Sequence, residues 1–129
     1  MPVVPHLESL EAVAGQSRTK EHFSFAYRDF LDGFYANPDP AGLTVEPRLL
    51  RDTLHDKGYA DAFLAALAEH LACHHHFPIP SWCRTPERSL PEPVFAFKTY
   101  EGRMFLLVES PTAFRVRNIF ISADALTRV

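Results

Sequence analysis

Apolar and aromatic side chains recur every three to four positions between residues 19 and 36. Charged and hydroxyl side chains fall on one side of a helical wheel, and four aromatic side chains fall on the other: Phe23, Tyr27, Phe30 and Phe34. This spacing is typical of an amphipathic helix. Ser17 or Thr19 is placed to cap its start. Pro38 and Pro40 end it, because proline lacks the amide that a continuing helix needs.

A second segment, at about residues 59–76, is apolar on nearly every side. Between Tyr59 and Cys73 only three residues are strongly polar: Asp61, Glu69 and His70. Six alanines in the same stretch favour a helix and allow neighbouring elements to approach closely. Because a helix without a polar face has to be buried, the pattern predicts the central helix of the fold.

A proline-rich segment follows this helix. Pro78 and Pro80 fix the backbone angle φ and remove amide donors, which favours an extended chain wrapped around the outside of the fold. Such a chain has no backbone ladder, so side-chain burial has to hold it, and we expect Trp82 to be its anchor. Thr85 followed by Pro86 predicts a short helical turn further along.

The C-terminal third contains shorter signals. Pro111 favours the start of a short helix that Asn118 ends, and Ile119–Ile121 is expected to run extended. Ser122 is placed to cap a last short helix. The run at residues 103–109 fits a buried strand as well as a buried helix, because a continuous apolar run has no period.

Together these elements predict a mainly α fold: a single helical domain over residues 1–129, with one or two short strands allowed. A chain of 129 residues, of which 47% are hydrophobic, is long enough for one core and too short for two. The spacing within residues 5–14 predicts a short helix that Gly15 ends. Nothing in the sequence indicates what this helix packs against, so we expect residues 1–16 to be loosely attached.

Composition also bears on location. No apolar run approaches the roughly 20 residues of a membrane span, and the first residues lack the basic start of a signal peptide. Cys73 and Cys83 are the only cysteines, and without an export signal we expect them to be thiols. The sequence therefore predicts a cytoplasmic protein that has no membrane partner.

The charge of the chain is uneven. The formal net charge is −3, which argues against direct binding to nucleic acid by overall charge. Residues 1–82 carry eleven acidic and six basic side chains, whereas residues 83–129 carry five and seven. An acidic first part suits a basic protein partner.

A histidine cluster at the end of the predicted central helix is a candidate metal site. His70 and His74 are four residues apart and project from one helix face, where they are able to share a metal ion. Cys83, after the proline-rich turn, is the candidate third ligand, and zinc suits this mixed set. The alternative is structural: histidines at a helix end are stabilised by its dipole, and His70 on an apolar side fits a hydrogen-bonded core residue.

Other chemistry-bearing residues point to structural roles. Asp61 and Glu69 are two turns apart on the apolar helix, and a structural role, such as capping or pairing with arginine, is favoured over acid–base chemistry. Arg115 and Arg117 fall on different faces, so we expect one to pair with an acid at the core edge and the other to face solvent. The sequence contains no glycine-rich nucleotide loop, no GxSxG elbow and no CxxC pair.

Several motifs resemble a family of small, uncharacterised bacterial proteins, found mainly in actinobacteria, that also occur behind helix-turn-helix domains. The motifs that carry the resemblance are YRDFLDGFY at 27–35, EPRL at 46–49, AEHLA at 68–72, PIPSW at 78–82, ESPTAFR at 109–115 and NIFI at 118–121. No activity is established for the family, and the resemblance implies an antitoxin-like role beside nucleotidyltransferase-like toxins. This chain departs from the pattern at residues 73–77, which makes a metal site common to the family unexpected. It also lacks dense arginines after Phe114 and a preceding helix-turn-helix pattern, which disfavours direct DNA binding.

The absence of catalytic motifs, the acidic first part and the resemblance favour one function. We expect a non-enzymatic protein-interaction module, antitoxin-like or a regulatory partner, without a cofactor. The alternative is a metal-binding protein or metal-dependent enzyme that uses His70, His74 and Cys83 as zinc ligands.

Overall fold

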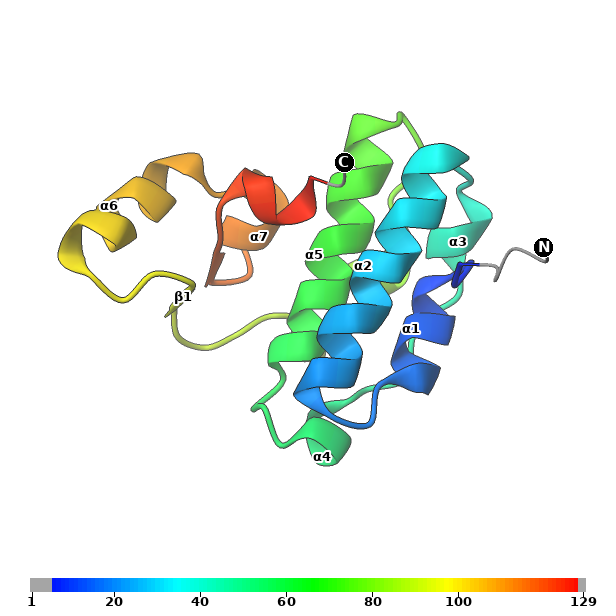
Figure 1. Cartoon of the computed structure of the whole chain (residues 1–129), viewed down its shortest axis with the longest axis horizontal. Coiled ribbons are helices and arrows are strands. Elements are labelled where there is room, and N and C mark those ends of the chain that lie inside the picture. Colours follow the sequence, from blue (N-terminus) through cyan, green and yellow to red (C-terminus); the bar gives the residue numbers. More distant parts are fainter. Residues whose placement is uncertain (1–5, 128–129) are drawn as a thin grey trace, which may run out of the picture.

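The computed structural model describes residues 6–127 and is mainly helical, as the sequence predicts. Two long helices, α2 (Lys20–Ala36) and α5 (Tyr59–His74), lie side by side (Figure 1). The short helix α1 (Leu10–Gln16) packs against α2, and α6 (Tyr100–Glu109) lies on the far side of the molecule from α1. None of the helices in this described range has both the length and the apolar character needed to cross a bilayer.

Aromatic rings fill the contact between α2 and α5. The rings of Tyr27 and Phe63 meet edge to face with centroids 4.8 Å apart, and Phe23 meets Phe63 at 5.7 Å. At the start of α2, Thr19 Oγ1 accepts a hydrogen bond from the His22 amide at 3.1 Å. The predicted amphipathic helix is therefore confirmed, with its aromatic side in the core.

The predicted central helix is also confirmed. Every residue from Ala60 to Ala68 is buried. Gly58 precedes the helix with a φ of +89°, a conformation that glycine adopts without the steric cost of a Cβ atom. The helix ends two residues before the predicted end, because the chain turns left-handed at His76 and the Phe77 amide donates to the Ala72 carbonyl at 2.8 Å.

The N-terminal helix differs from its prediction in both limits and attachment. It starts at Leu10 because Ser9 Oγ accepts a hydrogen bond from the Ala12 amide at 3.1 Å, and it continues through Gly15. Three of its side chains are fully buried: Leu10, Val13 and Ala14. Residues 10–16 are thus packed into the core rather than loosely attached, while residues 1–5 lie outside the described residues.

Short helical turns connect the long elements: α3 (Ala41–Thr44), α4 (Arg51–Leu54), η1 (Ser81–Arg84) and η2 (Pro86–Arg88). The turn η1 replaces the last part of the extended chain predicted after the central helix. The Trp82 side chain is 6% exposed, and its Nε1 donates to the Leu43 carbonyl at 3.0 Å. The predicted anchor is confirmed: Trp82 ties the proline-rich segment to α3.

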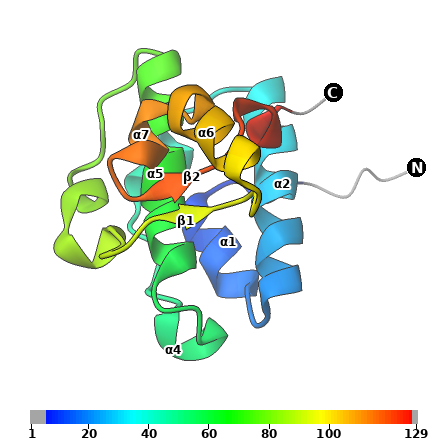
Figure 2. The same ribbon diagram turned by 90° about the vertical axis from the view of Figure 1, so that its left-hand side faces the viewer.

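The C-terminal part contains a small sheet and two more turns. The strands β1 (Val94–Phe95) and β2 (Ile119–Phe120) pair in parallel (Figure 2). Residues 103–109, which the sequence leaves open between strand and helix, are helical within α6. The turns are α7 (Thr112–Arg115) and η3 (Ala123–Leu126).

Candidate functional site: the exposed helical arm

Residues 94–109, which we call the arm, extend from the rest of the molecule. They consist of β1, a short link and α6, and Figure 1 shows α6 well separated from α1, α2 and α5. Leu106 is the one fully buried side chain in this range, and outside the arm α6 mainly contacts β2. Most of the surface of the arm is therefore open to solvent.

The outer side of α6 is apolar. Four side chains follow the i, i+4, i+7, i+8 spacing of a single helical face, and we call them the α6 stripe: Tyr100, Met104, Leu107 and Val108. Their exposed fractions lie between 41% and 74%, whereas Leu106, on the opposite side of the helix, is fully buried. Contiguous exposed apolar side chains of this kind mark interaction surfaces more often than isolated ones do.

Few contacts outside the arm hold it in place. The Val94 amide donates to the Asn118 carbonyl at 2.8 Å, and the Ala96 amide donates to the Phe120 carbonyl at 3.0 Å. The ring of Phe95 stacks on that of Phe120, with centroids 4.6 Å apart. The arm is thus joined to the body by a short parallel ladder, one ring pair and the buried Leu106 side chain. At its end, Ser110 Oγ donates to the Leu106 carbonyl at 2.6 Å and Arg115 to the Leu107 carbonyl at 3.4 Å.

Contacts within the arm define the start of α6. Thr99 Oγ1 accepts a hydrogen bond from the Gly102 amide at 3.0 Å, which caps the helix. A Cβ atom at Gly102 would lie 2.6 Å from the Cβ of Phe97, so the close approach of these residues requires glycine. The Arg103 guanidinium lies 5.4 Å from the centre of the Phe95 ring and links the helix to β1.

A buried arginine fixes the segment between α7 and β2, against which the arm is paired. Arg117 is 3% exposed; it donates to the carbonyls of Ala113 and Cys83 at 2.7 and 2.9 Å and pairs with Glu69 at 3.3 Å. These contacts connect α7 with η1 and with the central helix. Arg115 is exposed, so the predicted difference between the two arginines is confirmed.

A second polar network secures the start of the central helix. Asp61 accepts hydrogen bonds from the Leu50 amide at 2.6 Å and from Arg51 Nε at 3.0 Å. The fully buried Arg88 donates to the Asp61 carbonyl at 3.3 Å and lies 5.0 Å from the centre of the Trp82 ring. Asp61 and Glu69 thus have the predicted structural role, and of its two forms the structure shows pairing with arginine.

The predicted metal ligands lie in different settings. The rings of His70 and His74 are on the same side of α5 with centroids 4.2 Å apart, as their spacing predicts. Burial, helped by the neighbouring His74 and His75, lowers the pKa of His70 to about 4. Cys83 is buried in η1, and this burial raises the pKa of its thiol to about 12, which disfavours the thiolate.

The described residues do not assemble the predicted zinc site as a set of three. Within residues 6–127 no three His, Cys, Asp or Glu side chains are grouped closely enough to hold one metal ion. The structure therefore brings His70 and His74 together but does not join Cys83 to them. Zinc binding at these residues stays a prediction.

The α6 stripe was not found by sequence reasoning. A signal is present, because Thr99 is a good helix cap and Tyr100, Met104 and Leu107 have helical spacing. It is hidden by the continuous apolar run at 104–108, which has no polar side to show which residues face outward. Exposure of this run depends on what lies beside it in the fold.

Comparisons with protein-family models, with curated proteins and with solved structures found no match to this chain. The resemblance to the actinobacterial family therefore stays a prediction.

Proposed function

We propose that this chain is a non-enzymatic protein-interaction module, antitoxin-like or regulatory, that binds a partner protein through the α6 stripe. The observation that supports this proposal is the outward orientation of four apolar side chains on a projecting helix. A helix with anchors at i, i+4 and i+7 is a common form of ligand for an apolar groove. Transfer of one such side chain from water into a groove is worth about 1.5–3 kcal/mol.

The dimensions of α6 favour a groove on another protein over a second copy of this chain. A helix of ten residues is about 15 Å long, since each residue adds roughly 1.5 Å. Two such helices packed face to face bury much less than the roughly 1,200–2,000 Å² of a stable interface. A groove that surrounds α6 on three sides reaches Phe97 and Phe105 as well, which are 45% and 48% exposed.

Charge also supports a partner with a basic surface around its groove. The first 82 residues carry eleven acidic and six basic side chains, and electrostatic complementarity increases the rate and the specificity of association. The flanks of the α6 stripe are mixed, with Glu101 and Arg103 both exposed. The groove is therefore expected to be apolar and the surface beyond it basic.

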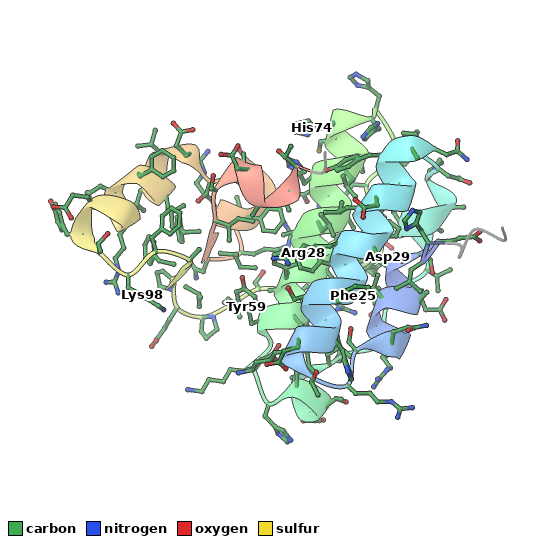
Figure 3. All side chains as sticks on the ribbon, in the orientation of Figure 1. Phe25, Arg28, Asp29, Tyr59, His74 and Lys98 are labelled. Atoms are coloured by element: carbon green, nitrogen blue, oxygen red, sulfur yellow. The ribbon has the colours of Figure 1, made fainter. Side chains whose placement is uncertain are left out.

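Co-purification from the native host with matched variants tests the proposal. Val108 on the arm and Phe25 on α2 are 74% and 75% exposed, so Val108→Asp and Phe25→Asp each add one charge at an equally exposed apolar site (Figure 3 labels Phe25). The unmodified chain and Phe25→Asp should retain the same protein, identified by mass spectrometry, whereas Val108→Asp should lose it. With the purified partner, calorimetry should give a Kd at least about tenfold higher for Val108→Asp, the equivalent of roughly 1.4 kcal/mol.

Two results contradict the proposal. One is that the chain is recovered without a macromolecular partner. The other is a partner that binds all three proteins with the same Kd, which places the interface away from α6. Circular dichroism of each variant checks that the helical fold is retained.

Metal binding is the second candidate function. The adjacent rings of His70 and His74 support it, because a ring separation of 4.2 Å allows both side chains to turn toward one ion. It has less support than the arm, since the described residues supply two neighbouring ligands rather than three. The Tm of the untagged chain, measured by differential scanning calorimetry with and without zinc, tests this second candidate.

A further inference from the structure

A cleft of about 460 Å³ lies beside the base of the arm. It is lined by α2, by the turn before α5, by the first turns of α5 and by β1: Lys20, Phe23, Ser24, Tyr27, Leu54, Asp56, Tyr59, Phe63 and Val94. We call it the aromatic cleft. Its volume is within the range of about 300–1,000 Å³ that is usual for small-molecule sites.

The aromatic walls of the cleft support one another. Phe63 is the common neighbour: its ring lies 4.8 Å from that of Tyr27, 5.7 Å from that of Phe23 and 6.0 Å from that of Tyr59. Phe23, Phe63 and Tyr27 are each less than 9% exposed. Because these rings belong to the packed core between α2 and α5, the apolar surface of the cleft is preformed.

Two phenol groups of the cleft lack a protein partner. Tyr27 is 8% exposed, yet neither its hydroxyl nor that of Tyr59 makes a hydrogen bond with any residue between 6 and 127. Tyr27, Asp56 and Tyr59 line the same cleft. Burial raises the pKa of Tyr59 to about 12, with smaller contributions from Tyr27 and Asp56, so its hydroxyl keeps the proton that it can donate to a ligand. Neither oxygen is among the buried side-chain atoms that lack a hydrogen-bond partner, so both hydroxyls reach solvent and are available to a ligand.

The cleft also carries one charge of each sign. Lys20 is exposed and forms no ion pair within the described part of the chain. Asp56 accepts hydrogen bonds from the amides of Gly58 and Ala60 at 3.0 and 2.9 Å, which hold its carboxylate in place and leave its charge unneutralised. A ligand with an anionic and a cationic group on an apolar body complements this arrangement.

We propose that the aromatic cleft binds a small zwitterion with an apolar body, of the class of α-amino acids with large apolar side chains. The apolar body packs on the rings of Phe23 and Phe63. The carboxylate faces Lys20, and the ammonium group faces Asp56 and the two phenol oxygens. Val94 of β1 lines the same cleft, so the bound molecule touches the base of the arm.

Calorimetry with three related probes tests this assignment. L-phenylalanine carries both charges, 3-phenylpropionate lacks the ammonium group and 2-phenylethylamine lacks the carboxylate. We expect L-phenylalanine to bind with a Kd at least tenfold lower than that of either of the other two. Equal affinity for all three, or no heat from any of them, overturns the assignment of a zwitterion.

Variants locate the binding in the cleft. Lys20→Gln should raise the Kd for L-phenylalanine at least fivefold and leave the Kd for 2-phenylethylamine unchanged. Tyr59→Phe, which removes only the hydroxyl, should weaken the binding of L-phenylalanine as well. Lys57→Gln is the matched control, because Lys57 is an exposed lysine that does not line the cleft. If Lys57→Gln changes the Kd for L-phenylalanine as much as Lys20→Gln does, the ligand does not bind in the aromatic cleft.

Discussion

The helices α5 and α6 both contain an apolar run, but α5 is buried and α6 is exposed. Both contain long apolar runs, from Tyr59 to Ala68 and from Met104 to Val108, each with few charges. In α5 every residue from Ala60 to Ala68 is buried, whereas in α6 Leu106 alone is buried. The difference comes from the neighbours. The helix α5 packs against α7, η1 and η2 and meets the aromatic rings of α2, while α6 meets mainly the short strand β2. An apolar run therefore stabilises the fold in one place and offers a surface to a partner in the other.

The largest effect is expected on the α5 side of this comparison. Trp82→Ala should lower the free energy of unfolding by about 3–5 kcal/mol, because it opens a cavity beside the central helix. It also removes the hydrogen bond to the Leu43 carbonyl and the ring beneath the Arg88 guanidinium. Urea denaturation measures this change. A loss below about 1 kcal/mol would show that the proline-rich segment is not docked on the core.

A pH effect of intermediate size is expected from His70. Its pKa of about 4 in the folded state lies below the ordinary value of 6.5, so the unfolded chain binds the proton more tightly. The contribution of the neutral side chain to stability is complete above pH 6.5 and is lost as the pH falls from 6.5 to 4. Urea denaturation across this range should show a loss of about 2 kcal/mol that His70→Gln removes. If the free energy of unfolding depends on pH equally in the variant and in the original chain, groups other than His70 cause the dependence.

Substitutions on the exposed and on the buried side of α6 should differ in their effect on stability. Val108→Asp should change the free energy of unfolding by less than about 0.5 kcal/mol, because the side chain is 74% exposed. Leu106→Ala, two residues away, should cost about 2–3 kcal/mol, since Leu106 is fully buried. Thermal and urea unfolding followed by circular dichroism compare them. Equal losses for the two would mean that the outer side of α6 is covered in solution.

The smallest effect is expected for zinc. With two adjacent imidazole ligands, stoichiometric zinc should raise the Tm of the untagged chain by less than about 1 °C, because a weakly bound ligand adds little stability. Differential scanning calorimetry with and without a chelator measures this. A larger increase that disappears in His70→Gln and His74→Gln would instead support the zinc alternative.

The parts of the fold that the sequence predicts well are those with long periodic signals. The helices α2 and α5 are found because their patterns extend over four turns or more, and Trp82 is found because a proline-flanked chain needs an anchor. The sequence indicates that Glu69 can pair with an arginine, but it does not indicate which one. The partner, Arg117, is 48 residues away in the chain. Contacts between residues so far apart in the sequence depend on the topology of the fold, which a local sequence pattern does not indicate.

The candidate site is predicted less well for the same reason. His70 and His74 are four residues apart on one helix, so local geometry places them together. Cys83 lies beyond a turn, and its position follows from how η1 packs on the core. The orientation of Tyr100 and Val108 depends on the absence of a neighbour, which no local pattern records.

The short parallel ladder between β1 and β2 has a consequence for the kinetics of partner binding. A parallel pairing of only two residues per strand and one stacked ring pair hold the strand of the arm, so residues 94–109 are expected to unfold locally while α2 and α5 stay folded. Such sub-global opening lets α6 adopt several orientations before it docks. The partner then binds the molecules in which α6 is already suitably oriented, and the fraction of such molecules sets the association rate. Native-state hydrogen exchange would reveal it as amides in residues 94–109 that exchange well before those of α5.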